Sequence, residues 1–426
     1  MERYSEYKDS GVEWLGEIPR HWEVIKNKYL FSESDERNVF GEYKLLSFSK
    51  SKGIIPYDQN TDKESSAEDI RNYKVLHKGQ LLENRLQAWN GMFQDSSVEG
   101  CVSPDYSVFN LIYSNANIKY YSYLFKTDLY IAQWANASKG IGSGFNRLYT
   151  PQFGNIVSLV PPIEEQNAIV SYLDKVTSKI DAAIAQQQKM IELLNERKQI
   201  IINNAVTKGL VPTAKMKPSG IPWLGNIPAH WRTVPIKRYI SVKTGKTPST
   251  TNKNFFDGGT INWFTPGDIM TTKLCASDRK VTQKAIKEDT CPLFTPYTVY
   301  LVGIGGTIGK VAYSEKEASC NQQINALIPN EKYVHYKYLA LFIHTSTVQI
   351  YQNANLSTLP IINQERTGSL LLSLPSITEQ KNIVKYIETK TQPIVNYIQR
   401  VKEKMELLQE RKQIIINEVV TGKVKI

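Results

Sequence analysis

Apolar residues recur every three or four positions in two long stretches of this chain. The first stripe comprises Ile169, Leu173, Val176, Ile180, Ala183, Met190, Leu194 and Ile201, and the second Ile383, Ile387, Ile394, Val401, Leu408 and Ile415. Gln187 and Arg197 are polar positions on the first seam. This spacing is typical of long helices that bury one face in a coiled coil. Prolines precede each stripe and Gly209 or Gly422 follows it, which predicts where each helix begins and ends.

The second stretch contains a proline that the first does not. Pro393 falls where the first stretch has Lys179. Proline removes a backbone donor and clashes with the preceding turn, so we expect the second helix to kink or restart there.

The two stretches are copies of each other. Residues 161–207 match 375–421 at 23 of 47 positions, with the block ERKQIIIN shared by 196–203 and 410–417. A shorter echo relates 10–22 to 219–231, whereas 23–160 and 232–374 show almost no mutual resemblance. The chain is therefore two copies of one plan carrying different inserts, and we expect it to recognise two different things.

Within the inserts, short aliphatic and aromatic runs alternate with glycine, proline and asparagine. Residues 44–48, 107–113 and 297–302 predict strands, and 118–136 and 336–352 predict helices, so each insert is α+β. A helix of about forty residues would separate the inserts by up to ~60 Å. We predict two globular α+β domains joined by two long antiparallel coiled-coil helices with pseudo-twofold internal symmetry. The domains are expected at 1–160 and 210–374, and the helices at 161–209 and 375–426.

Composition favours an acidic partner. The 426 residues carry a net charge of +11, which suits nucleic acid or an anionic membrane surface. No apolar run is long enough to cross a bilayer and the first nine residues have no apolar core, so we expect a cytoplasmic protein that does not enter a membrane. The four cysteines are scattered, and neither they nor the five histidines have metal-ligand spacing.

No catalytic or cofactor motif is complete. The glycine cluster at 303–310 has Ile304, Ile308 and Val311 where phosphate-binding and dinucleotide-binding loops need other residues, so a tight strand turn is the better interpretation. The Asn/Asp-Pro-Pro-aromatic loop of amino methyltransferases is missing, and Glu-x-Lys triplets at 42–44 and 388–390 are typical of chance. His21 and His230 occupy equivalent places beside Trp22 and Trp231, which favours packing. We therefore predict no catalytic residue, no metal ligand and no cofactor bound by this chain.

Several segments resemble the specificity subunit of type I restriction-modification enzymes. They are 7–22, 99–106, 160–166, 244–249 and 374–380, together with the duplicated helix. The resemblance implies two target-recognition domains, each reading one half of a split asymmetric sequence in double-stranded DNA. It also implies helices that set the spacer and dock two methyltransferase (modification) subunits, with restriction/translocase subunits in the same complex. Adenine methylation and cleavage, with S-adenosylmethionine, ATP and Mg, would then belong to the partner subunits and not to this chain.

DNA contacts need cations for phosphates and forked polar groups for base edges. On that basis the candidate DNA-binding residues are Lys50, Lys52, Asn84, Arg85, Gln87, Lys139, Ser143, Asn146, Arg147, Lys243, Lys246, Thr247, Ser249, Lys253 and Lys273. The candidate partner-docking residues are Arg197, Lys198, Arg411 and Lys412, for which a solvated charged face is the open alternative. Two other classes of function also stay open: a self-contained nuclease or methyltransferase, and a scaffold that joins two proteins.

Overall fold

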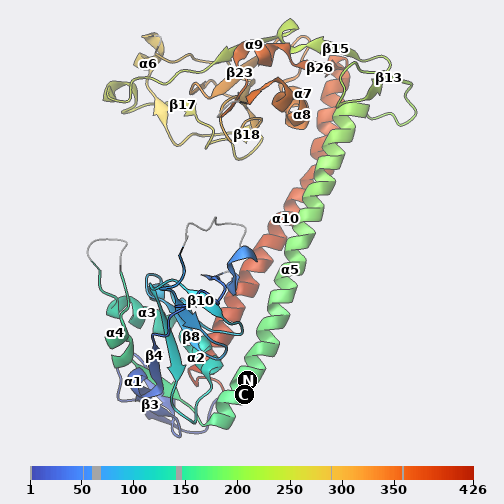
Figure 1. The fold of residues 1–426 in the computed structure, drawn as a ribbon. Helices are drawn as coiled ribbons and strands as arrows, with labels where there is room; N and C mark the ends of the chain where they lie inside the picture. Colours follow the sequence, from blue (N-terminus) through green and yellow to red (C-terminus); the bar gives the residue numbers. More distant parts are fainter. Residues whose placement is uncertain (1, 51, 60–68, 141–145, 289, 357–358) are drawn as a thin grey trace. The chain divides into compact units, whose positions relative to one another are not determined.

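The computed structural model describes residues 2–50, 52–59, 69–140, 146–288, 290–356 and 359–426. The chain forms two compact units (Figure 1). Unit 1 comprises Met1–Gln188 and Lys402–Ile426, and unit 2 comprises Lys189–Val401. There are two long helices, α5 (Ile163–Lys208) and α10 (Ile377–Val420). Part of each helix belongs to unit 1 and the rest to unit 2. Both helices and the α+β character of the chain are confirmed.

The helices pack in antiparallel directions within each unit. In unit 1, Ile169 and Leu173 of α5 share a core with Val419 of α10, and Lys412 Nζ lies 2.7 Å from Asp181 further along. In unit 2, the last turns of α5, with Ile202 and Val206, share a core with Ile383 and Ile387 near the start of α10. The antiparallel pairing predicted from the connectivity is therefore present in both units.

The seam of α5 follows the period of a straight helix. Its buried and half-buried positions include Ile169, Leu173, Thr177, Ile180, Ile184, Gln187, Ile191, Leu194, Lys198, Ile202 and Ala205. These steps average about 3.6 residues, so the seam drifts away from a strict heptad by about 20° per seven residues. Gln187 lies on the seam as predicted. Met190 and Arg197 are exposed, so their placement on the seam is wrong.

Helix α10 runs through Pro393 without interruption. The prediction of a restart there is wrong. Pro393 is exposed, so the carbonyl that loses its intrahelical donor can be hydrated, and the helix tolerates the proline on this face.

Unit 1 is built on a four-stranded antiparallel sheet in the order β4-β11-β8-β9. These strands are β4 (Phe31–Ser34), β11 (Tyr106–Leu111), β8 (Leu81–Asn84) and β9 (Phe93–Asp95). Helices α2 (Ile118–Leu124), α3 (Asp128–Ala137) and α4 (Thr150–Asn155) lie beside them (Figure 1). Unit 1 also contains α1 (Asn27–Leu30) and the strand pairs β5 (Leu46–Ser49) with β6 (Gly53–Pro56), β7 (Lys74–Leu76) with β10 (Gly100–Val102), and β3 (Glu23–Lys26) with β12 (Val157–Val160).

Unit 2 contains a five-stranded sheet in the order β16-β23-β20-β21-β18. These strands are β16 (Ile240–Thr244), β23 (Ile324–Pro329), β20 (Thr298–Val302), β21 (Val311–Ser314) and β18 (Lys273–Leu274). The helices of the unit are α6 (Gln283–Lys287), α7 (Tyr336–Thr345), α8 (Thr347–Asn353) and α9 (Gln364–Ser369). A second sheet has β17 (Ile261–Phe264) between β19 (Lys280–Val281) and β22 (Ser319–Cys320), and two further pairs are β15 (Arg232–Pro235) with β26 (Leu371–Leu374) and β24 (Asn355–Leu356) with β25 (Pro360–Ile361).

The two inserts share one strand order although their sequences do not resemble each other. The antiparallel run β4-β11-β8-β9 of unit 1 has the same connectivity as β16-β23-β20-β21 of unit 2. The strand register also agrees: Val108 of β11 pairs with Ser34 of β4 and Leu82 of β8. In the same way, Ala326 of β23 pairs with Lys243 of β16 and Tyr300 of β20. The duplication therefore includes the inserts, whose cores accept different apolar residues on one backbone plan.

The upstream echo caps the start of each long helix. Trp22 and Trp231 are fully buried, and each indole Nε1 donates to a first-turn carboxylate, Glu165 Oε2 at 3.1 Å and Glu379 Oε1 at 3.0 Å. His21 Nε2 lies 2.8 Å from Glu165 Oε2, and His230 Nε2 lies 3.0 Å from Glu379 Oε2. These acidic residues also lie where the helix dipole favours negative charge. Small hairpins, β1 (Tyr7–Asp9) with β2 (Glu17–Pro19) and β13 (Met216–Pro218) with β14 (Asn226–Pro228), precede the two echoes' tryptophans.

The two chain ends meet in unit 1. Lys425 N donates to Glu2 O at 2.8 Å, and the Tyr7 hydroxyl donates to Gly422 O at 3.1 Å. Among the described residues, every helix is either too short or too polar to traverse a lipid bilayer.

Candidate nucleic-acid interface

In unit 1 the predicted DNA-binding loops meet where β8 ends and β11 begins. Leu148 N donates to Arg85 O at 3.1 Å, which ties the segment after residue 146 to the turn that follows β8. Lys139 and Arg147 pair through their backbones at 2.9 Å in both directions. Lys50 Nζ donates to Asn90 Oδ1 at 3.3 Å, on the same turn. Segments far apart in sequence thus form one surface, here named the unit 1 loop surface, which consists of 49–50, 52, 84–91, 139–140 and 146–148.

The side chains on this surface differ in availability. The predicted contacts Lys50, Lys52, Gln87, Lys139 and Asn146 are exposed. Asn84 is half-buried and its Oδ1 accepts from Leu86 N at 3.1 Å, so it shapes the turn. Arg147 is half-buried, with Nη2 at 3.5 Å from Asp105. Ser143 lies outside the described residues.

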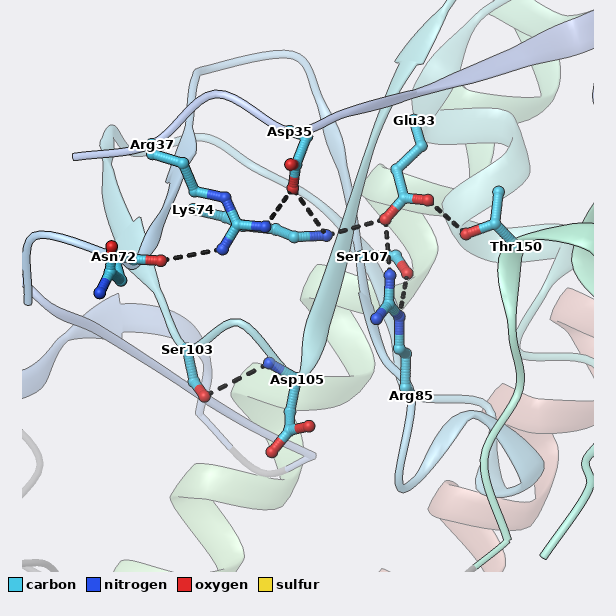
Figure 2. Close-up of polar contacts among 10 residues, drawn as sticks. All are labelled: Glu33, Asp35, Arg37, Asn72, Lys74, Arg85, Ser103, Asp105, Ser107 and Thr150. Atoms are coloured by element: carbon cyan, nitrogen blue, oxygen red, sulfur yellow. Dashed lines mark hydrogen bonds and ion pairs between the residues drawn. The ribbon is translucent and has the colours of Figure 1, made fainter. Parts of the chain in front are cut away.

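Arg85 is held by a polar cluster beneath the turn (Figure 2). Its Nη2 lies 2.6 Å from Glu33 Oε1, and its Nε donates to Ser107 Oγ at 2.7 Å. Glu33 also accepts from Lys74 Nζ at 2.8 Å and from the Thr150 hydroxyl. Burial alone would raise the pKa of Glu33, but these hydrogen bonds and cations outweigh burial and lower its pKa. The cluster favours a role for Arg85 in positioning the turn.

Glu83 lies fully buried next to this cluster. It precedes Asn84 on β8, opposite Ser107 and Phe93, and neither of its carboxyl oxygens has a hydrogen-bond partner among the described residues. Burial raises the pKa of Glu83 to about 8, although the nearby charge of Arg85 acts in the opposite direction. A buried carboxyl group of this kind is protonated at neutral pH.

In unit 2 the predicted segment 244–253 begins at the corresponding end of the sheet. Lys246 N donates to Cys320 O at 3.0 Å, and Trp263 Nε1 donates to Lys246 O at 3.0 Å. A Cβ on Gly245 would stand 2.3 Å from backbone oxygens of Cys320 and Asn321, so only glycine permits this close approach. The predicted contacts Lys243, Lys246, Thr247, Ser249 and Lys253 are all exposed.

Lys273 stands apart from that segment. It lies on β18, at the edge of the five-stranded sheet, and its Nζ is 2.5 Å from Glu315 Oε2. This ion pair partly neutralises the charge that suggested a phosphate contact.

Sequence reasoning missed the glycine-rich residues 303–310 as part of this surface. They form the tight turn between β20 and β21, as predicted, and a Cβ on Gly303 would stand 2.7 Å from Ile362 O. Ile362 N donates to Gly303 O at 2.8 Å, which repeats the Leu148 to Arg85 bond of unit 1. The separation of Leu148 and Ile362 equals that of the repeated helices, so the repeat spacing could have identified these two residues as equivalent positions.

The helix surfaces present a further feature that sequence reasoning missed. Arg197 and Arg411 are exposed, each between two exposed apolar residues of the repeated helices, with Leu193 at 50% and Ile200 at 51% in one copy. In the other copy, Leu407 is 65% exposed and Ile414 is 47% exposed. Spacings of four and three residues put each trio on one helix face. We name them the α5 stripe (193, 197, 200) and the α10 stripe (407, 411, 414).

The adjacent lysines differ from the arginines. Lys198 and Lys412 are half-buried on the seams, and Lys412 is paired with Asp181 at 2.7 Å. Lys412 therefore contributes to helix packing in unit 1, and its availability to a partner is reduced.

Within the described parts of the chain, no group of three or more His, Cys, Asp or Glu side chains is arranged to hold a metal ion. Cys101, Cys291 and Cys320 are buried and Cys275 is exposed, all as free thiols. The arrangement offers cations, amides, hydroxyls and close backbone approach, which are the groups that bind phosphates and read base edges.

Known proteins resemble this chain over most of its length. The sequence model described as "Type I restriction modification DNA specificity domain" matches residues 20–193 and 228–407. The putative type I restriction enzyme MjaX specificity subunit of Methanocaldococcus jannaschii is 22% identical over 97% of this chain and 96% of its own. The MjaIX specificity subunit of the same organism is 31% identical over 38% of each chain. A solved structure from work on complex assembly and conformational transition of the type I R-M system has a TM-score of 0.70 at 15% identity, covering 96% of this chain and 99% of that one.

Proposed function

The chain belongs to the type I restriction-modification DNA specificity family, and we propose that each unit reads one half of a bipartite, asymmetric target in double-stranded DNA. One observation carries the proposal: the two units repeat one sheet order but place different residues at the same end of it. Because the two units share one backbone plan, equivalent surfaces of each unit contact DNA. The side chains on these surfaces differ, so the two units read different bases. The basic net charge of +11 supports a phosphate-rich partner.

We assign the long helices two roles. Their length sets the spacer between the half-sites, because α5 and α10 each pass without interruption from one unit into the other. The α5 stripe and the α10 stripe dock two methyltransferase subunits, one each, and restriction/translocase subunits complete the assembly. The repetition of the same apolar and arginine positions supports two copies of one partner, since leucine side chains exposed at about half their surface gain free energy when covered.

Chemistry is assigned to the partner subunits. This chain contributes recognition and geometry, while S-adenosylmethionine, ATP and Mg are bound elsewhere in the complex. The incomplete sequence motifs at 303–310, 42–44 and 388–390 support this assignment.

Exchange of the first insert tests the central proposal. Residues 23–160 are replaced by the insert of another specificity subunit, and methylated adenines are mapped in cells that express the complex. One half of the recognised motif should change and the other half and the gap should stay. A change in both halves, or in neither, contradicts modular reading.

Removal of about one heptad from both helices tests the spacer role. The motif halves should persist while the accepted gap shifts, because the units are joined through a shorter rise. An unchanged gap in the mapped motif contradicts the proposal.

Variants on the two stripes test docking. Leu193→Asp and Leu407→Asp should each weaken binding of one methyltransferase subunit by roughly 30-fold, since burial of a leucine contributes about 2 kcal/mol. The number of methyltransferase subunits bound per specificity chain, measured by mass photometry, should fall from two to one. Gln199→Asp, at an exposed position on another face of α5, is the control. Full assembly by both leucine variants would exclude the stripes as docking surfaces.

A further inference from the structure

The glycine-rich turn of unit 2 has two neighbours that complete a surface. Gly303 N donates to Gln323 O at 2.8 Å, so residues 303–310 lie beside the segment that leads into β23. The Thr247 hydroxyl donates to Gln322 Oε1, which joins the segment after β16 to the same place. Residues 244–249, 303–310 and 320–323 therefore form one continuous surface, here named the unit 2 turn surface.

The chemistry of this surface is that of a base-reading edge. Its exposed members are Lys246, Thr247, Ser249, Gly306, Thr307, Lys310 and Gln322. The three segments contain lysines at 246 and 310 and no aspartate or glutamate. A glutamine amide offers a donor and an acceptor side by side, which matches the major-groove edge of adenine, and lysines match phosphates.

Gly306 adds a second, independent observation. Among the described residues, a Cβ built at Gly306 meets no atom within 4 Å, and the backbone there does not have the left-handed conformation found at Gly305, where φ is +97°. Neither packing against the described part of unit 2 nor the backbone conformation thus requires glycine at 306. A partner that approaches the backbone closely would require it.

Unit 1 places its own predicted contacts in the same position. The turn after β8 carries Gln87, and its bond from Leu148 N to Arg85 O is the counterpart of the bond from Ile362 N to Gly303 O. The segment before β11 corresponds to 320–323, because Tyr106 and Ile324 hold the same register against β8 and β20. The two surfaces are equivalent in the fold and different in side chains.

We propose that the unit 2 turn surface reads its half-site of duplex DNA. Gln322 contacts a base edge in the major groove, Lys246 and Lys310 contact flanking phosphates, and Gly306 lets the turn approach the sugar-phosphate backbone. This inference rests on the proposed reading of one half-site by each unit, and it identifies the segments that do so.

The test uses the full chain assembled with its methyltransferase subunits and DNA duplexes that carry every single-base change in the mapped motif. Gln322→Ala should lose discrimination at one position of one half-site by about 5- to 150-fold, because a bidentate contact separates right from wrong bases by that factor. Lys310→Ala should weaken binding to all duplexes alike and reduce the salt slope by about 1. Gly306→Val should weaken binding without lowering the thermal unfolding temperature.

Lys332→Ala is the matched control. Lys332 is equally exposed but follows the far end of β23, away from Gln322. It should change neither base preference nor salt slope. An unaltered preference in Gln322→Ala together with full affinity in Gly306→Val would overturn the inference, while the exchange of residues 23–160 would still report on half-site reading. If the complex of the unaltered chain shows no preference among these duplexes, that result contradicts the proposed function itself.

Discussion

Replacing Glu83 with glutamine should stabilise unit 1 at alkaline pH and have little effect near pH 4. The carboxyl group is fully buried without a hydrogen-bond partner among the described residues, and burial raises its pKa from 4.5 to about 8. The unfolded chain ionises this group first, so between pH 4.5 and 8 the folded state binds more protons than the unfolded state. The free energy of unfolding therefore falls as the pH rises through this window.

The magnitude follows from the two pKa values. At about 1.4 kcal/mol per pH unit, the cost of keeping Glu83 buried reaches roughly 3 kcal/mol at pH 7 and about 5 kcal/mol above pH 8. Glutamine has the shape of the neutral acid and no charge to desolvate, so it removes this cost. Such a gain is a large fraction of the about 5–15 kcal/mol by which domains are stable.

Urea unfolding at pH 4.5, 7 and 8.5 measures the effect, and hydrogen exchange of the β8 and β11 amides assigns it to unit 1. The difference between Glu83→Gln and the unaltered chain should grow with pH. Burying the glutamine amide could itself lower the free energy of unfolding, so Glu83→Leu, whose side chain has no polar atoms, is a second variant. It should show the same dependence on pH. A difference that is constant across the three pH values would refute the assignment of a protonated buried carboxyl group.

Two further changes test the frame. The buried amide of Gln166 bonds Asn117 N at 2.8 Å, Pro161 O at 2.7 Å and a third backbone group, and Gln380 does the same in unit 2. Gln166→Ala and Gln380→Ala should each cost about 3 kcal/mol in the unit concerned, at about 1 kcal/mol per bond; calorimetry that shows a loss below ~1 kcal/mol would contradict this. Lys412→Ala should change the free energy of unfolding by less than about 1 kcal/mol, because its ion pair is partly exposed, and a larger loss would show that the pair is essential to helix packing.

The helices and the duplication could be predicted from sequence because their determinants are local. A helix buries residues three and four positions apart, so the spacing of Ile169, Leu173 and the apolar residues that follow predicts the helix. No knowledge of a residue distant in sequence is needed. The same reasoning placed Arg197 on the seam, and that failed because a straight helix drifts against a heptad over several turns. Pro393 was read locally too, but whether a proline interrupts a helix depends on which face it occupies.

The candidate site was only partly visible in the sequence. Composition selected exposed cations and hydroxyls such as Lys246 and Thr247, and the fold joins Thr247 to Gln322. It also selected Arg85, which the fold commits to Glu33 and Ser107, and it passed over the turn at 303–310.

The sequence alone determined that this chain is an internal duplication, with two long amphipathic helices and two inserts of dissimilar sequence. Only the tertiary structure decided that the inserts share one strand order, that Glu83 is buried, and that distant loops form one surface at the end of each sheet. The physical reason is range: helix periodicity is satisfied between neighbours. Strand pairing, burial and ion pairing instead join residues tens to hundreds of positions apart, whose meeting no local pattern specifies.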